Sequence, residues 1–207
     1  LQVLLESSNE DNIKIVCLKI FSQFKNKRID FSTEFLLNSI SFSLSNIFNE
    51  ESLVCYFAAL ASSSLVNLIK DDENISSQIL ENESIIERIN DLFAIFFELE
   101  RDYQTEMITA SLMQIVIFFG QKIQPFLYQI SNEVVEFFFS FASNRENHQP
   151  SILLSSILCK LIEISEGDPN FITYLLKEIL NEENWANINF PIAFDKLFEI
   201  LTNLIYY

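Results

Sequence analysis

Glycine and proline are scarce in this chain, with two glycines and four prolines among 207 residues. Tight hairpins between β-strands rely on glycine-rich turn chemistry, so this shortage argues against an all-β fold. The same shortage leaves no phosphate-cradling GxxxxGK or GxGxxG motif, and no GxSxG nucleophile motif is present. We therefore expect an all-α chain without catalytic residues, that is, not an enzyme.

Histidine and cysteine are also rare. The only histidine, His148, lies in a polar stretch without a second histidine or cysteine nearby, so we expect no metal site and no cofactor. Cys17, Cys55 and Cys159 are far apart and form no CxxC pair. We expect three buried, reduced thiols in a cytoplasmic or nuclear protein. Acidic pairs at expected helix starts are interpreted as caps, not as catalytic carboxylates.

Basic residues are few, because 13 lysines and arginines face 29 acidic residues, for a net charge of −16. This charge excludes the phosphate backbone of nucleic acids as an expected partner and favours basic peptides or protein faces. The alternative is that the excess of acidic residues only keeps an apolar chain soluble. No secretory signal pattern occurs, and apolar runs such as 115–119 are too short to span a bilayer. We expect no membrane insertion and no small-molecule substrate.

Apolar residues recur with helical spacing along the whole chain, and 21 of the residues are phenylalanine. One such row comprises Ile13, Val16, Cys17, Ile20 and Phe24. The helix breakers fall between these rows. Prolines at 125, 150, 169 and 191 precede an apolar row, as in a first helical turn, and glycines at 120 and 167 follow one, as in a left-handed cap. The pattern predicts successive helices joined by short corners.

The expected helices recur at repeat length. The longer helices start near residues 11, 50, 102, 146 and 189, and the second helices cover about 33–47, 75–99, 126–141 and 168–180. The polar stretch 71–90 is expected to hold a loop and a short extra helix. The intervals between the starts of the longer helices, of 39, 52, 44 and 43 residues, centre near the roughly 40–47 residues of armadillo and HEAT repeats. The sequence therefore predicts a right-handed α-α superhelix of about four to five repeats. A globular helical bundle is the alternative fold.

We expect one repeat domain over residues 1–207. Both ends of the sequence fall within apolar rows, so we expect this domain to be a fragment of a longer array.

Two stretches resemble armadillo/HEAT nuclear transport receptors, the karyopherins. Residues 110–127 resemble the long helix, glycine stop and proline-started helix of that family, and residues 161–172 resemble a corner that closes an importin-α repeat. Residues 64–69, followed by 72–74 and 85–86, give a weaker match. The resemblance implies a protein-binding solenoid.

Importin-α carries a Trp-x-x-x-Asn array that holds cargo peptides. Alignment on the helix stops places Asn67, Val116 and Glu163 at the asparagine position, with Asn203 in the last repeat. The tryptophan position holds Ser63, and the only tryptophan, Trp185, is expected in a loop, so the sequence departs from the array. The resemblance implies a binding set of Asn67, Glu163 and Asn203, with Asp71 and Asp72 at a helix end. The alternative is that all five are ordinary solvated positions.

Two functional hypotheses follow. The first is a nuclear transport receptor or adaptor that recognises basic cargo peptides. The second is an armadillo/HEAT scaffold subunit of a signalling, coat or phosphatase complex. Phenylalanine clusters such as 137–139 are expected in the core between repeats, and an exposed stripe for a partner is the alternative.

Overall fold

The computed structural model describes residues 10–24, 31–144, 147, 149–186, 188 and 191–206, and the side chains of 191 and 192 are outside this description. Within these residues the regular elements are all helices and no strand occurs. The expected all-α class is confirmed. The chain divides into two compact units, Leu1–Phe118 and Phe119–Tyr207. The expectation of a single repeat domain stays a prediction.

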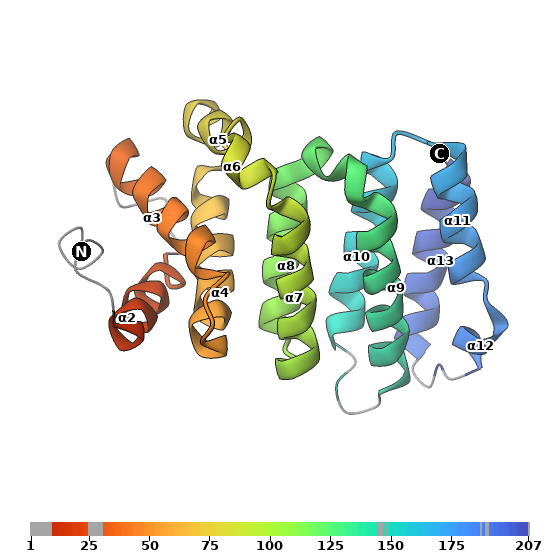
Figure 1. Ribbon diagram of the computed structural model, residues 1–207. Coiled ribbons are helices and arrows are strands. Elements are labelled where there is room, and N and C mark those ends of the chain that lie inside the picture. Colours follow the sequence, from red (N-terminus) through yellow and green to blue (C-terminus); the bar gives the residue numbers. More distant parts are fainter. Residues whose placement is uncertain are drawn as a thin grey trace. The chain divides into compact units, whose positions relative to one another are not determined.

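The first unit is organised around one apolar helix, α4 (Ser52–Ile69). This helix contacts four others of the unit, which are α2 (Asp11–Phe21), α3 (Thr33–Asn46), α5 (Glu73–Leu80) and α7 (Ile89–Tyr103). The short α6 (Glu83–Ile86) connects α5 to α7, and α8 (Glu106–Phe119) follows α7. Figure 1 shows α3 and α7 in front of α4 and α8, so the unit has two helical layers.

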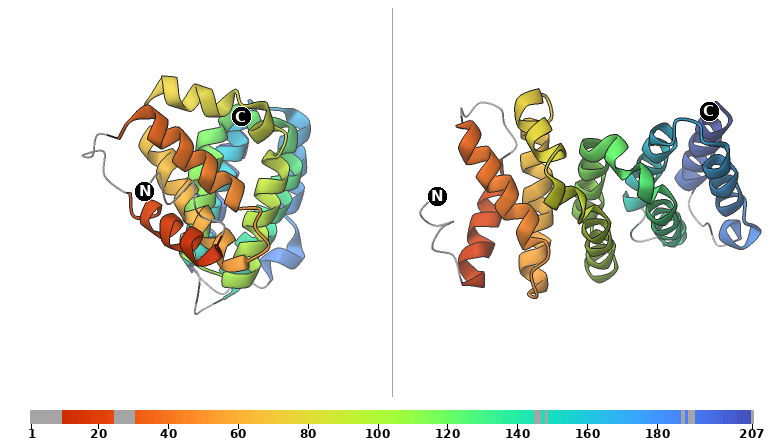
Figure 2. Two further views of the ribbon diagram at one scale, coloured as in Figure 1. Left: turned by 60° about the vertical axis from the view of Figure 1, so that its left-hand side comes forward. Right: turned by 45° about the horizontal axis from the view of Figure 1, so that its top comes forward.

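The second unit has the same layered construction. It begins with a 3₁₀ helix, η1 (Gly120–Phe126), and continues through four longer helices and the short α12 (Glu182–Trp185). The longer helices are α9 (Leu127–Ser143), α10 (Gln149–Ile164), α11 (Pro169–Ile179) and α13 (Pro191–Tyr206). Contacts join α9 to α10 and α11, and join α13 to α10 and α11. The views in Figure 2 agree with this pairing.

Phenylalanine fills the interior of both units. Phe93 and Phe96 on α7 and Phe138 on α9 are at most 1% exposed. Removing such an aromatic side chain from water stabilises the folded state by on the order of 2–3 kcal/mol. Residues 137–139 are all buried, which confirms that this run belongs to the core and does not form an exposed stripe.

Most helix breakers occupy the expected positions. Pro169 is the first residue of α11, and Asp168 caps that helix by accepting a hydrogen bond from the Asn170 N–H at 3.0 Å. Gly167 has a φ of 77°, a backbone region that favours glycine. The expectation for Pro125 is wrong, because Pro125 lies inside η1 and α9 begins two residues later. Proline lacks the N–H that a residue in a helix interior donates, which fits its position before α9 rather than within it.

Two further expectations need correction. The second helix expected over about 75–99 is restricted to α7, and the short helices α5 and α6 precede it within 71–90, where a loop and a short extra helix were expected. The side chains of Asp72 and Asn82 cap α5 and α6 and so start new helices within a polar stretch. Trp185 ends the short helix α12 instead of lying in a loop. Its indole N–H donates to the Ile179 carbonyl at 2.6 Å, which fixes the ring against α11. His148 lies outside the described residues.

The helix α4 is also long and apolar enough to cross a membrane by length and composition. A count of uninterrupted apolar runs misses it, because Ser62, Ser63 and Ser64 divide its apolar sequence. The core helix of a globular unit meets the same criterion, and 61% of this segment is buried inside the structure. The expectation of no membrane insertion therefore stays a prediction.

One carboxyl group is buried in the first unit. Glu100 on α7 is 1% exposed, and its Oε2 accepts a hydrogen bond from the Thr109 hydroxyl of α8 at 3.0 Å. Its Oε1 has no hydrogen-bond partner among the described residues. Burial raises the pKa of Glu100 to about 7, and the Thr109 bond opposes this rise only in part. Glu100 is thus held mainly as the neutral acid below that pH.

This buried acid gives a testable pH dependence of stability. The folded chain retains the Glu100 proton to a higher pH than the unfolded chain, so stability is lost as the pH rises from about 4.5 to about 7. The pKa shift corresponds to a loss of up to about 3 kcal/mol, which Glu100→Gln is expected to remove. Urea unfolding followed by circular dichroism at several pH values measures the effect.

The control is Glu98→Gln, since Glu98 is exposed on the same helix. This variant is expected to retain the pH dependence of the wild type. Identical pH profiles for Glu100→Gln and the wild type would contradict the role of Glu100.

Candidate functional site

The first unit contains a hollow of about 380 Å³ between α4, α8 and the end of α2. It is built from two helical rows and the chain that follows α2. The lining residues are Ser22, Gln23, Phe24, Leu60, Ser63, Ser64, Asn67, Met107, Ala110, Ser111 and Gln114. None of these residues is charged, although the chain carries 42 charged side chains, the sum of 13 basic and 29 acidic residues. The hollow is therefore uncharged, and its lining combines polar side chains with apolar surface.

Each lining residue of α4 has a counterpart on α8 that lies 47 positions later in the sequence. Leu60 pairs with Met107, Ser63 with Ala110, Ser64 with Ser111, and Asn67 with Gln114. On each helix these positions are i, i+3, i+4 and i+7, which share one face. Small residues at the two middle positions leave the space open. Each row ends in a carboxamide, so Asn67 and Gln114 occupy equivalent places on adjacent helices.

The two carboxamides are available for a ligand. Neither Asn67 nor Gln114 makes a side-chain hydrogen bond to another described residue. Ser64, in contrast, already donates its hydroxyl hydrogen to the Ser22 carbonyl at 3.0 Å. Asn67 is exposed and Gln114 is half-buried. A carboxamide presents one acceptor and two donors, the complement of a peptide group. The arrangement can therefore bind an extended backbone.

A second hollow of about 290 Å³ adjoins the first, because Gln114 lines both. Its other lining residues are Val66, Lys70, Asp71, Ser76, Leu80, Ile117 and Phe118. We call the two hollows together the α4–α8 groove. Two of the predicted binding residues, Asn67 and Asp71, lie in this groove. The structure thus brings together one part of the predicted set.

Asp72 has a different role from the predicted one. Its carboxylate accepts hydrogen bonds from the backbone N–H groups of Asn74 and Ile75, at 3.1 and 3.2 Å. Asp72 is the N-cap of α5, a role that stabilises a helix by about 1 kcal/mol. It does not line the α4–α8 groove.

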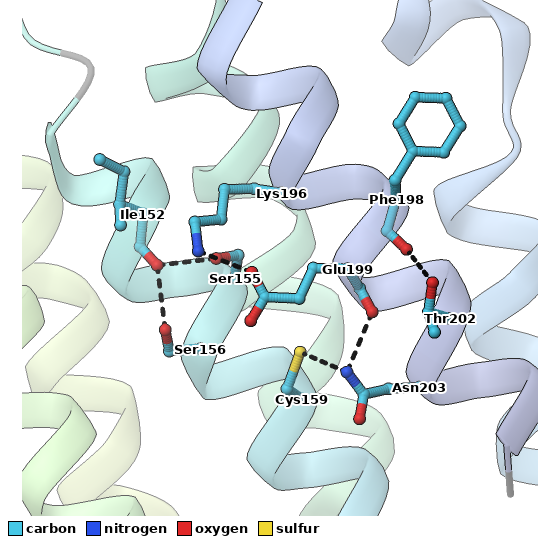
Figure 3. Close-up of polar contacts among 9 residues, drawn as sticks. All are labelled: Ile152, Ser155, Ser156, Cys159, Lys196, Phe198, Glu199, Thr202 and Asn203. Atoms are coloured by element: carbon cyan, nitrogen blue, oxygen red, sulfur yellow. Dashed lines mark hydrogen bonds and ion pairs between the residues drawn. The ribbon is translucent and has the colours of Figure 1, made fainter.

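Glu163 and Asn203 belong to the second unit and are not placed with the groove residues. Glu163 on α10 is exposed and forms an ion pair with Lys160 at 2.8 Å. The Asn203 amide donates to the Glu199 carbonyl at 2.9 Å and to the Cys159 sulfur at 3.4 Å. Figure 3 shows these contacts between α10 and α13, beside the Lys196–Glu199 ion pair. Asn203 therefore connects two helices.

One residue that the alignment on the helix stops assigned to the asparagine position is not accessible for binding. Val116 is completely buried, so it presents no side chain to a groove, and Gln114 stands two residues earlier on the exposed side of α8. The 47-residue correspondence with Asn67 could have identified Gln114 in the sequence. It was missed because η1 follows α8 without a gap and obscures where the helix ends.

The environment of the Cys159 thiol suppresses its reactivity. Burial, and next the Glu199 carboxylate, raise the pKa of the Cys159 thiol to about 11. The thiolate is the reactive form, so Cys159 is a poor nucleophile at neutral pH. Cys17, Cys55 and Cys159 are all free thiols, and Cys159 is only half-buried, in contrast to the expected full burial.

Among the described residues, no group of three or more histidine, cysteine or acidic side chains is arranged to hold a metal ion. The expectation of no metal and no cofactor stays a prediction.

The comparisons with known proteins add no assignment. No family model matches the chain, and no curated protein or solved structure matches it at a significant level. The resemblance to karyopherins is untested by them. The groove geometry therefore carries the functional argument by itself.

The thiol environment generates a second prediction. The rise of the Cys159 pKa from 9.0 to about 11 lowers its thiolate fraction at pH 8 by about a hundredfold. We expect a Cys17→Ala, Cys55→Ala variant to react with an aromatic disulfide reagent at least tenfold more slowly when folded than in urea. Stopped-flow absorbance measures both rates. Equal rates, with circular dichroism showing a folded variant, would overturn the prediction.

Proposed function

We propose that the helix pairs are armadillo/HEAT-type repeats of a right-handed α-α superhelix with about four to five repeats. The supporting observation is the sequence separation of side-chain hydrogen bonds between helices. Six such bonds join residues 42 to 51 positions apart, among them Tyr56 to Met107 and Asn203 to Cys159. Contact between equivalent positions of neighbouring repeats is the defining property of a solenoid.

The proposed biochemical function is non-catalytic binding of an extended protein segment in the α4–α8 groove. The single observation that carries this proposal is the pair of unengaged carboxamides, Asn67 and Gln114, on adjacent helices. Main-chain hydrogen bonds to such groups give affinity without depending on the peptide sequence. Leu60 and Met107 at the other end of the rows offer apolar contact for a side chain of the peptide.

The expected ligand is a basic peptide. The chain carries a net charge of −16, and an acidic field accelerates encounter with lysine- and arginine-rich segments. Within the groove, Asp71 supplies the acidic side chain and Lys70 opposes it, so the preference for positive charge arises mainly from the protein as a whole. These properties favour a transport receptor or adaptor for basic cargo in the cytoplasm or nucleus.

A scaffold for folded subunits is the second candidate, and α13 supplies the observation in its favour. Phe198 and Ile205 are 60% and 82% exposed and lie seven residues apart, on one face of the helix. Two large apolar side chains on one face are typical of a surface that docks another protein. In this reading the partner is a signalling, coat or phosphatase subunit rather than a peptide.

Peptide binding tests the proposed function. A fluorescent lysine- and arginine-rich peptide is titrated into the full chain at low and physiological salt, with anisotropy as the readout. We expect micromolar affinity that weakens with salt. Asn67→Ala and Gln114→Ala are each expected to weaken binding by about tenfold, because each removes one or two hydrogen bonds.

The matched controls are Asn38→Ala on α3 and Gln129→Ala on α9, which remove exposed carboxamides outside the groove. Both are expected to bind as the wild type does. Binding that is lost in Phe198→Ala but unchanged in the groove variants would support the scaffold. The absence of binding at low salt would contradict a peptide groove.

A further inference from the structure

The first unit has a further pocket, of about 200 Å³, which is lined by residues of α3, α6 and the first turn of α7. It is separate from the α4–α8 groove and shares no lining residue with it. Its apolar side includes Leu44 and Leu92, which are 6% and 3% exposed. No acidic residue lines the pocket, although the chain has more than twice as many acidic as basic residues. The single charged side chain at this pocket is Arg88.

The Arg88 guanidinium lies over an aromatic ring. Its guanidinium carbon lies 3.5 Å from the centroid of the Phe48 ring. Arg88 forms no ion pair with any described residue, although Glu87 and Asp91 are its close neighbours in the sequence. A guanidinium that lies over an aromatic ring still has N–H groups along its edge, and these can form two parallel hydrogen bonds to one carboxylate. Arg88 therefore presents an unused positive edge at the pocket.

Two neutral groups add donors around Arg88. The Asn82 Oδ1 is occupied, because it accepts from the Ser84 N–H at 3.1 Å and from the Ser84 hydroxyl at 2.7 Å. The NH₂ of Asn82 is consequently the end left to donate. The Ser41 hydroxyl lines the same pocket and makes no hydrogen bond to a described residue. Three side chains from different elements thus offer donors at one apolar cavity.

We propose that this pocket binds a small carboxylate that carries an apolar group. One arginine balances one negative charge, which favours a carboxylate over a dianionic phosphate. Leu44, Leu92 and the Phe48 ring contact the apolar part of the ligand. The volume is below the roughly 300–1,000 Å³ of pockets for drug-sized ligands, so the ligand is of about the size of one aromatic side chain. This inference is independent of the proposed peptide groove.

Benzoate is the probe for this pocket, and the full chain is titrated while amide proton–nitrogen NMR spectra are recorded. We expect saturable shifts confined to 41–48 and 82–92. Benzyl alcohol has the same ring without the charge and is expected to bind at least tenfold more weakly. Arg88→Gln is expected to weaken benzoate binding by about tenfold or more, and Arg88→Lys by less, because it retains the charge.

The matched control is Lys70→Gln, which removes an exposed cation outside this pocket and is expected to leave benzoate binding unchanged. Unaltered benzoate affinity in Arg88→Gln would overturn the proposal, and so would the absence of saturable shifts in the wild type. Inorganic phosphate that binds as tightly as benzoate would overturn the assignment to a carboxylate. If Arg88 serves only to hold α7 on α3, its replacement lowers the melting temperature and benzoate does not bind the wild type.

Discussion

Burial of α4 by the helices around it is the constraint on which the first unit depends. Four of its side chains are at most 2% exposed where α4 packs on the neighbouring helices: Val54, Leu65, Val66 and Ile69. Burial of each such side chain stabilises the folded state by about 1.5–3 kcal/mol. A helix enclosed in this way has a fixed rotation about its axis. That rotation turns the row from Leu60 to Asn67 toward α8 and leaves small residues where the groove opens. The position of the groove is therefore a consequence of core packing.

The polar side chains discussed above fall into two groups, those that hydrogen-bond within the fold and those that do not. Asp72 and Asn203 look like binding residues in the sequence, yet their hydrogen bonds cap α5 and connect α13 to α10. Asn67, Gln114 and Arg88 have hydrogen-bonding capacity that no described residue satisfies. These three side chains line hollows open to water, where their polar groups avoid the cost of burial without a partner. The two proposed sites are built from these groups.

Much of the helical framework was predictable, and the errors have local causes. The starts of α2 and α3 match the expected residues 11 and 33, and the Ser32 side chain caps α3 by accepting from the Phe35 N–H. A second helix was expected over about 75–99, with a loop and a short extra helix within 71–90. The Asp72 and Asn82 caps start the short helices α5 and α6 there, and the longer α7 begins only at Ile89. Pro125 was expected at an α-helix start, but a 3₁₀ turn intervenes. Of the binding set, Asn67 and Asp71 lie in the groove. Gln114 was missed because the register of α8 was assigned two residues too late.

The sequence by itself determined that the chain is helical, where most helices begin, and that phenylalanine forms the core. These properties depend on residues close together in the chain, on periodicity and on caps, which are local interactions. Only the tertiary structure decided which polar residues meet. The shared hollow of Asn67 and Gln114, the position of Arg88 over Phe48, and the burial of Glu100 beside Thr109 depend on helix rotation and on contacts between separate elements. Packing between helices sets the rotation of each helix about its axis, so local sequence patterns do not specify that rotation.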